Sequence, residues 1–141
     1  MRTYKIAVAS AAAIVAAVLP AASAAADQPS THAKSHPLTV LVLTKAHAGI
    51  NPNPAPEEAA LLGCNPSWGW HPQAEEACAT LKSVAGDFGK LNVNPSELCN
   101  KIFQPVTVTA QGWWKGKKVS YEKTFSNPCE LQKTTGAVFG F

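Results

Sequence analysis

The chain has 141 residues, with 12 basic and nine acidic side chains and a formal net charge of +3. Arg2 and Lys5 belong to an N-terminal leader, and without them ten basic residues face nine acidic ones, a net charge of +1. So small a charge gives no electrostatic reason to expect nucleic acid or an anionic membrane surface as a partner. The length that follows the leader is enough for one domain.

The first 26 residues have the three-part layout of a secretory signal peptide. A basic start is followed by an apolar run over residues 6–19 and by a tract of small residues. A membrane anchor is the alternative, but the run is shorter than the roughly 20 residues that a bilayer-spanning helix needs. We expect residues 1–26 to be a signal peptide cleaved after Ala24 or Ala26. The mature protein is then expected to be secreted, extracellular and without a membrane partner.

The next part of the chain changes from polar to strand-like. Residues 27–37 are polar without an apolar period, so we expect a flexible N-terminal arm before a domain over residues 38–141. The β-branched and apolar residues at 38–44 predict a buried strand. Alternating prolines at 52, 54 and 56 predict a loop. Residues 57–64 fit helix or strand by local propensity, and we interpret them as a strand.

Residues 72–84 carry the clearest helix pattern. A proline stands in the first turn with two glutamates close behind, where the helix dipole favours anions. Apolar residues at 74, 77, 78, 81 and 84 fall on one face, and Gly86 ends the segment.

The C-terminal third is strand-like. Apolar and polar residues alternate at 106–111 and at 119–125, which predicts an antiparallel hairpin. Glycines within residues 112–117 allow the chain to turn back. We expect a last short strand over residues 137–141, and the whole domain is therefore predicted to be α+β.

Four cysteines, an even number, follow the leader: Cys64, Cys78, Cys99 and Cys129. In an oxidising compartment they are expected to form two disulfides, for which three pairings are possible. We favour Cys64–Cys78 with Cys99–Cys129, because each bridge then closes a local loop without crossing the other. No Cys-x2-4-Cys spacing is present, which argues against a zinc site, and we expect no metal and no cofactor.

Catalytic motifs are absent from the sequence. It has no His-Glu-x-x-His, no Gly-x-Ser-x-Gly and no P-loop pattern, and oxidised cysteines are not nucleophiles. We therefore predict that the protein is not an enzyme and that it binds another molecule.

Residues 98–105 are the segment best suited to binding. Cys99 ties one end, and a proline leads the other end into the predicted strand. The segment therefore loses its conformational entropy on folding, before a partner binds. If it projects outward, it offers Lys101, followed by Ile102 and Phe103, to a protease cleft as a substrate would. The alternative is that Lys101 is an ordinary surface lysine and that the two residues after it belong to a core strand.

Short motifs are spread over the chain after the leader: LVLT at 41–44, ACATL at 77–81, GKKVSYE at 116–122, FSNPCE at 125–130 and VFGF at 138–141. Together with the spacing of the four cysteines, they resemble the bacterial secreted subtilisin-inhibitor family, whose type member comes from Streptomyces. The resemblance covers essentially the whole predicted mature chain.

The resemblance implies a secreted serine protease inhibitor with a five-stranded antiparallel sheet, two helices on one face and two disulfides in the pairing favoured above. It also implies a homodimer formed through the sheet. The scissile bond would be Lys101–Ile102, with Lys101 at P1, the position that fills the enzyme's specificity pocket. The other protease-contacting residues would be Leu98, Cys99, Asn100, Phe103 and Gln104.

Two residues of this loop modify the expectation. The family often has proline at P2, where this chain has Asn100. A proline would stiffen the loop, whereas an asparagine offers a side-chain hydrogen bond within it. Lysine at P1 predicts trypsin-like as well as subtilisin-like targets, because trypsin-like enzymes hold a carboxylate at the base of that pocket.

Four tryptophans support an alternative function, a secreted carbohydrate-binding β-module: Trp68, Trp70, Trp113 and Trp114. Exposed aromatic rings on such a module stack on sugar rings. However, Trp113 and Trp114 are adjacent, so on a strand they face opposite ways, and at least one is expected to be packed.

Overall fold

The structure, a computed structural model, describes residues 37–47 and 55–141. The predicted signal peptide and all but the last residue of the predicted arm lie outside this range, as does most of the proline-rich loop. No helix within the described residues has the length and apolarity needed to cross a bilayer.

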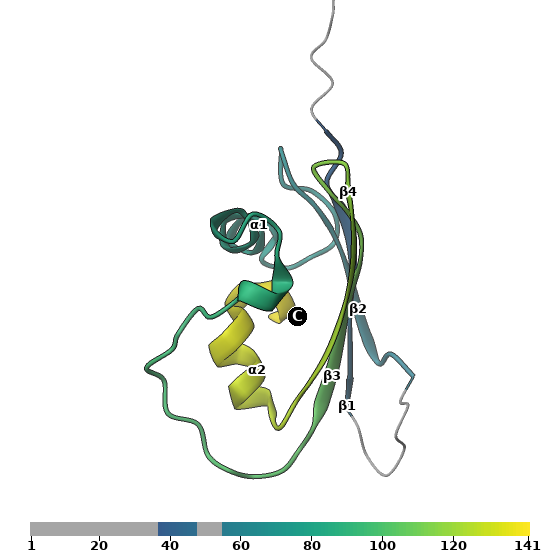
Figure 1. Cartoon of the computed structure of the whole chain (residues 1–141). Coiled ribbons are helices and arrows are strands. Elements are labelled where there is room, and N and C mark those ends of the chain that lie inside the picture. Colours follow the sequence, from purple (N-terminus) through teal and green to yellow (C-terminus); the bar gives the residue numbers. More distant parts are fainter. Residues whose placement is uncertain (1–36, 48–54) are drawn as a thin grey trace, which may run out of the picture. The chain divides into compact units, whose positions relative to one another are not determined.

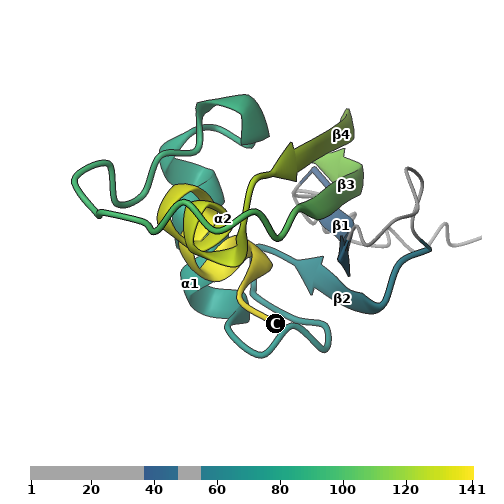
Figure 2. The same ribbon diagram turned by 90° about the horizontal axis from the view of Figure 1, so that it is seen from below.

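Four strands form one antiparallel sheet (Figure 1), and Figure 2 shows their order, β2-β1-β3-β4. The strands are β1 (Val40–His47), β2 (Glu58–Gly63), β3 (Val106–Trp114) and β4 (Lys117–Phe125). At one end of the sheet Val40 pairs with Gly63 and with Trp113, and at the other end His47 pairs with Val106. The segment that leads into β3 therefore arrives at the end of the sheet opposite to the one where β2 finishes.

The two predicted strands at 38–44 and 57–64 and the predicted hairpin are confirmed. The first strand begins two residues later than expected and continues to His47, and residues 58–63 are a strand rather than a helix. The hairpin turn is tighter than expected, because β3 and β4 extend to within two residues of each other. Lys115 and Gly116, both with positive φ, make that turn.

One face of the sheet is covered by α1 (Ala74–Ser83) and α2 (Pro128–Thr135), which both lie on the same side of the strands (Figures 1 and 2). Two short 3-10 helices, η1 (Phe88–Lys90) and η2 (Gly136–Phe139), complete this layer. The strands bury alternate residues toward it, and this alternation places the core between the sheet and the helices. The largest fully buried side chains are Leu41, Leu43, Leu62, Leu81, Val106, Val108, Val138, Thr39 and Thr135.

The predicted helix at 72–84 is confirmed as α1, although it is slightly shorter at both ends. Ala77 and Leu81 are its fully buried residues, as the apolar face required. Two helices on one face of the sheet also agree with the family resemblance.

The expected five-stranded sheet is wrong, because the described residues form a sheet of four strands. The predicted last strand at 137–141 is instead the 3-10 helix η2 followed by two residues without regular structure. Gly136 turns the chain with φ 52° directly after α2, and Val138 and Phe139 are then buried in the helical layer. A short apolar run fits either a strand or a buried helical turn, so its pattern alone does not distinguish the two.

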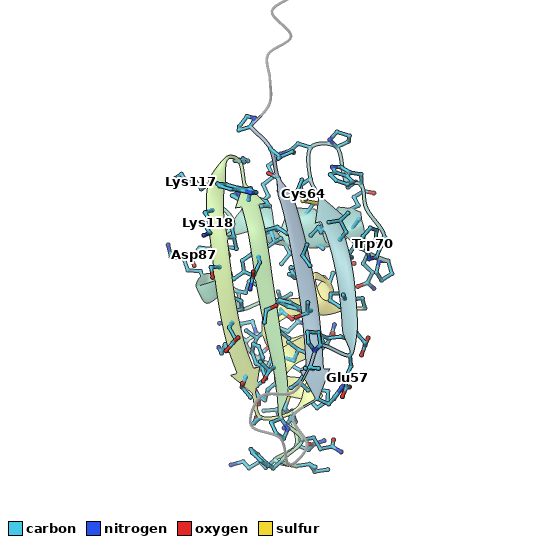
Figure 3. The ribbon with its side chains drawn as sticks, turned by 90° about the vertical axis from the view of Figure 1, so that its right-hand side faces the viewer. Glu57, Cys64, Trp70, Asp87, Lys117 and Lys118 are labelled. Carbon is cyan, nitrogen blue, oxygen red and sulfur yellow. A yellow bond between two sulfur atoms is a disulfide. The ribbon has the colours of Figure 1, made fainter. Side chains whose placement is uncertain are left out.

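Two disulfides fix the helical layer, in the pairing favoured from the sequence. Cys64, just after β2, is bonded to Cys78 in α1, and Cys99 is bonded to Cys129 in the first turn of α2. The two cysteines of the first bridge are 14 positions apart in the sequence, and those of the second bridge are 30 positions apart. Figure 3 shows Cys64 at one end of the sheet and Glu57 toward the other.

Candidate functional site

The segment between η1 and β3 runs from residue 91 to residue 105 without helix or strand (Figure 1). Its side chains around Lys101 point into solvent: Leu98 is 95% exposed, Ile102 58% and Phe103 78%. Lys101 itself is also exposed. Several large apolar side chains exposed together on one segment are typical of an interaction site. The alternative that Ile102 and Phe103 belong to a core strand is therefore wrong.

The segment is anchored to α2 and to the end of β4 at three places. Near its start, the N–H groups of Val93 and Asn94 donate to carbonyl groups in the last turn of α2, over 3.1 and 2.9 Å. In the middle, Cys99 is held by its disulfide. Near its end, the N–H of Gln104 donates to the carbonyl of Ser126 over 2.9 Å. The short stretch from residue 100 to residue 103 therefore lies between two fixed points.

The side chain of Asn127 holds the backbone of this stretch by hydrogen bonds. Its side-chain Nδ2 donates to the carbonyl oxygens of Asn100 and Ile102, over 3.0 Å in each case. Its Oδ1 accepts from the N–H of Glu130 over 2.9 Å, which makes Asn127 the N-cap of α2. Only 3% of its surface is exposed. One buried amide thus holds the carbonyl groups on both sides of Lys101, and its own position is fixed by the helix.

Sequence reasoning missed Asn127 as a functional residue, although a local signal for the cap was present. Asn127 is followed by Pro128 at the first helical position and by Glu130 at the third, a pattern typical of helix N-termini. The pattern predicts the cap and the start of α2. The contacts of the side-chain nitrogen reach 27 and 25 positions back along the chain, and no local pattern contains them.

Asn100 adds a second hydrogen bond across Lys101. Its Oδ1 accepts from the backbone N–H of Ile102 over 3.2 Å. This is an Asx-turn, in which a side-chain oxygen binds the backbone two residues on. Asn100, at the position where the family often has proline, therefore does form a hydrogen bond within the loop.

The structure brings all seven predicted loop residues, 98–104, into one exposed segment. One disulfide and four hydrogen bonds close to Lys101 fix this segment. Among the described residues, no group of three or more His, Cys, Asp and Glu side chains lies close enough to hold a metal ion. What the segment offers to a partner is its shape: a fixed backbone with a cation and three exposed apolar side chains.

The tryptophans divide as expected for adjacent strand positions. Trp114 is buried, whereas Trp113 is about half exposed. Trp68 lies against Gly63, where a Cβ would meet the indole ring at 1.9 Å, so this ring packs on the backbone at the end of β2. Trp70 is exposed beside the sheet edge (Figure 3). Trp113 and Gly63 both pair with Val40, and Trp68 packs on Gly63, so Trp113 and Trp68 lie at the same end of the sheet.

The fold and the loop together define a class of protein: a small, disulfide-bonded α+β domain that presents one fixed peptide segment. The profile of the family described as subtilisin inhibitor-like matches residues 37–127. Subtilisin inhibitor-like protein 4 from Streptomyces lavendulae is 48% identical over 104 residues, which cover 73% of this chain and 90% of that protein. Trypsin inhibitor STI2 from Streptomyces longisporus is 40% identical over 104 residues, 73% of this chain and 72% of that protein.

A solved structure is also similar, that of Streptomyces caespitosus sermetstatin in complex with Bacillus licheniformis subtilisin. The two chains superpose with a TM-score of 0.60 at 30% identity, over 74% of this chain and 99% of sermetstatin. The chain therefore belongs to the subtilisin inhibitor-like family. Members of this family are inhibitors of proteases, not enzymes, which agrees with the lack of catalytic motifs.

Proposed function

We propose that this protein inhibits serine proteases of the subtilisin and trypsin types, and that Lys101–Ile102 is its reactive bond. The single observation that carries the location is the side chain of Asn127, which holds the carbonyl groups on both sides of Lys101. A substrate loop needs no such support, because its products leave the enzyme after cleavage. An inhibitor loop needs it, because the loop must stay intact in the active site of the protease.

The mechanism follows from how the loop is anchored. A protease binds the exposed stretch from Leu98 to Gln104 as it would bind substrate, with Lys101 in its specificity pocket. The loop is already ordered, so little conformational entropy is lost on binding. If the enzyme cleaves after Lys101, the Cys99–Cys129 disulfide and the two hydrogen bonds of Asn127 keep the new ends near each other. The products cannot separate, and the bond re-forms.

The exposed side chains suggest how different enzymes are accommodated. The ammonium group of Lys101 suits the carboxylate at the base of a trypsin-like pocket. Leu98, with 95% of its surface exposed, is available to fill an apolar pocket on the enzyme three residues before P1. Ile102 and Phe103 offer apolar surface on the other side of the reactive bond. Subtilisin-like enzymes would then be bound chiefly through these apolar contacts.

The protein is further proposed to be secreted, with residues 1–26 as a signal peptide that is removed on export. Two disulfides and no free cysteine in the described residues suit an oxidising, extracellular compartment. Determination of the N-terminus of protein recovered from the culture medium tests this part. The expected first residue is Ala25 or Asp27.

A homodimer through the outer face of the sheet is the remaining part of the proposal. On this face, opposite the helices, Val42 and Trp113 are each about half exposed. A shallow depression runs beside them, lined by Val42, Thr44, Pro56, Thr109, Gln111 and Gly112. The reactive loop lies on the helical side of the sheet in Figure 2, so pairing through the outer face leaves both loops free for proteases.

The reactive bond can be tested directly by long incubation with a catalytic amount of trypsin at mildly acidic pH. We expect one slow cut, which creates a new chain that begins at Ile102 and stays attached through the Cys99–Cys129 bridge. Sequencing of the new N-terminus identifies the cut. A first cut at any other lysine would contradict the assignment of Lys101 to P1.

A further inference from the structure

We propose that Asn100 holds the leaving nitrogen of the reactive bond and thereby favours re-formation of the bond over hydrolysis. This inference rests on the proposed function, and it adds a specific role for a residue at which this chain departs from the proline common in its family.

The geometry places Asn100 and its hydrogen-bond partner on opposite sides of the bond. Asn100 precedes Lys101 and remains with the part that would be acylated to the enzyme, whereas Ile102 supplies the nitrogen that leaves. The contact of 3.2 Å between Asn100 Oδ1 and Ile102 N therefore connects the two products of cleavage. Asn127 also spans the bond, but it holds only carbonyl oxygens. Asn100 acts on the reacting nitrogen itself.

The chemical step shows why that nitrogen matters. The serine hydroxyl of the protease attacks the carbonyl carbon of Lys101, and its proton passes through the enzyme's base to the nitrogen of Ile102. The C–N bond breaks, and an ester to the serine and a free amine on Ile102 are formed. In the reverse step the amine attacks the ester and gives a proton to the base, which passes it to the serine oxygen as the ester C–O bond breaks. Hydrolysis needs the amine to move aside so that water can take its place.

An acceptor bound to the Ile102 N–H keeps the amine close to the ester carbon and occupies the path by which it would leave. Proline at the same position would stiffen the backbone before Lys101 but would offer no side-chain acceptor. Asn100 therefore contributes a different kind of constraint, which acts on the fate of the acyl-enzyme. The backbone of Asn100 is held separately by Asn127, so removal of the Asn100 side chain leaves the main support of the loop intact.

The experiment compares Asn100→Ala, which loses the acceptor, with Asn100→Ser. The serine hydroxyl is also a neutral acceptor for this turn, on a shorter side chain. Asn92→Ala, an exposed asparagine before the anchored stretch, is the matched control. Each protein is mixed with excess trypsin, so that all inhibitor is bound and differences in affinity do not matter. The rate of net cutting at Lys101–Ile102 and the rate at which cut inhibitor is resealed are measured by reversed-phase chromatography after reduction.

We expect net cutting of Asn100→Ala to be roughly three- to tenfold faster than that of the wild type, the effect of one hydrogen bond, with resealing slower. Asn100→Ser should recover a large part of the difference, and Asn92→Ala should match the wild type. In the free protein, hydrogen exchange at the Ile102 amide should be faster in Asn100→Ala, with an unchanged melting temperature.

Equal cutting and resealing rates for Asn100→Ala and the wild type would overturn this inference while leaving inhibition through Lys101 intact. So would an Asn100→Ser variant that behaves like Asn100→Ala, because the role would then not depend on an acceptor. A wild-type protein that does not inhibit trypsin or subtilisin at all would instead overturn the proposed function, and this inference with it.

Discussion

The side-chain nitrogen of Asn127 lies 3.0 Å from the carbonyl oxygen of Asn100, and the same side chain caps α2 through its oxygen. A second bond of equal length reaches Ile102. The start of a helix and an exposed loop 27 residues earlier are thus held by one buried amide. Because the helix fixes the amide and the amide fixes the loop, the rigidity of the helical layer extends to the backbone around Lys101.

This relationship predicts the behaviour of Asn127→Ser. Serine is also a good N-cap, so α2 should keep most of its stability. Its hydroxyl is too short to reach both carbonyl groups, and two hydrogen bonds to the loop are lost. We expect the inhibition constant for trypsin to rise roughly ten- to hundredfold, from two bonds of about 0.5–1.5 kcal/mol each. Inhibition assays and thermal unfolding of the same samples check this. An inhibition constant that stays unchanged in Asn127→Ser would show that the loop does not depend on these bonds.

The two disulfides provide a matched pair for separating stability from inhibition. Replacement of both cysteines by serine should cost about 3 kcal/mol of unfolding free energy for Cys64–Cys78 and about 4 kcal/mol for Cys99–Cys129, from the lengths of the closed loops. Only the second bridge holds the reactive loop, since Cys64 lies at the far end of the sheet (Figure 3). We therefore expect the Cys99–Cys129 variant to be digested by trypsin, and the Cys64–Cys78 variant to inhibit below its lower melting temperature. Denaturant unfolding and inhibition assays measure both. Equal loss of inhibition in the two variants would contradict a local role for Cys99.

Several elements of the fold could be predicted from the sequence because their patterns are local. The alternation in β3, the alternation in β4 and the apolar face of α1 each lie within one segment. The end of the chain could not be predicted in this way, because the apolar run at residues 137–141 fits both a strand and a buried helical turn. Gly136 and burial against α1 decide between them, and the second of these is a tertiary effect.

The candidate site shows the same division. Lys101 and its neighbours were identified from Cys99, from the proline that leads into β3 and from the family resemblance. The hydrogen bonds of Asn127 join parts of the chain that are distant in sequence, and only the folded structure brings them together. The Asx-turn of Asn100 spans two residues and was within reach of sequence reasoning, although its direction across the reactive bond required coordinates.

Tyr121 gives a prediction for the pH dependence. Burial raises the pKa of its phenol above the ordinary value of 10.0. Its ring stacks on Phe88 with centroids 5.3 Å apart. The neutral phenol is favoured in the folded state, so its contribution to stability is complete below pH 10.0 and is lost as the pH rises through the folded-state pKa. The other tyrosine, Tyr4, lies in the predicted signal peptide, so absorbance at the phenolate band reports Tyr121 alone in the mature protein.

We expect Phe88→Ala to expose Tyr121 and to move its pKa back toward the ordinary value. Phe103→Ala, which removes an exposed phenylalanine of the reactive loop, is the control and should leave the titration unchanged. A spectrophotometric titration of the three proteins is the measurement. The assignment to burial is contradicted if Phe88→Ala, while still folded, titrates like the wild type.

The proposed dimer is tested by Val42→Lys, which places a charge in the middle of the outer face of the sheet. If this face is an interface, a buried and unpaired ammonium group is costly there, and sedimentation velocity should show a shift from dimer to monomer. Gln132→Lys on the exposed side of α2 adds the same charge on the helical side and should leave the dimer unchanged. Both variants should still inhibit trypsin. A wild type that sediments as a monomer at high micromolar concentration would contradict the dimer.

Titration of active-site-counted trypsin and subtilisin with the mature protein tests whether Lys101 enters the specificity pocket of the protease. The measurement is made beside Lys101→Glu, with Lys133→Glu in α2 as the matched control for charge. We expect stoichiometric inhibition of both enzymes by the wild type and by Lys133→Glu, and the loss of trypsin inhibition in Lys101→Glu. Full trypsin inhibition by Lys101→Glu, or digestion of the wild type without inhibition, would contradict it.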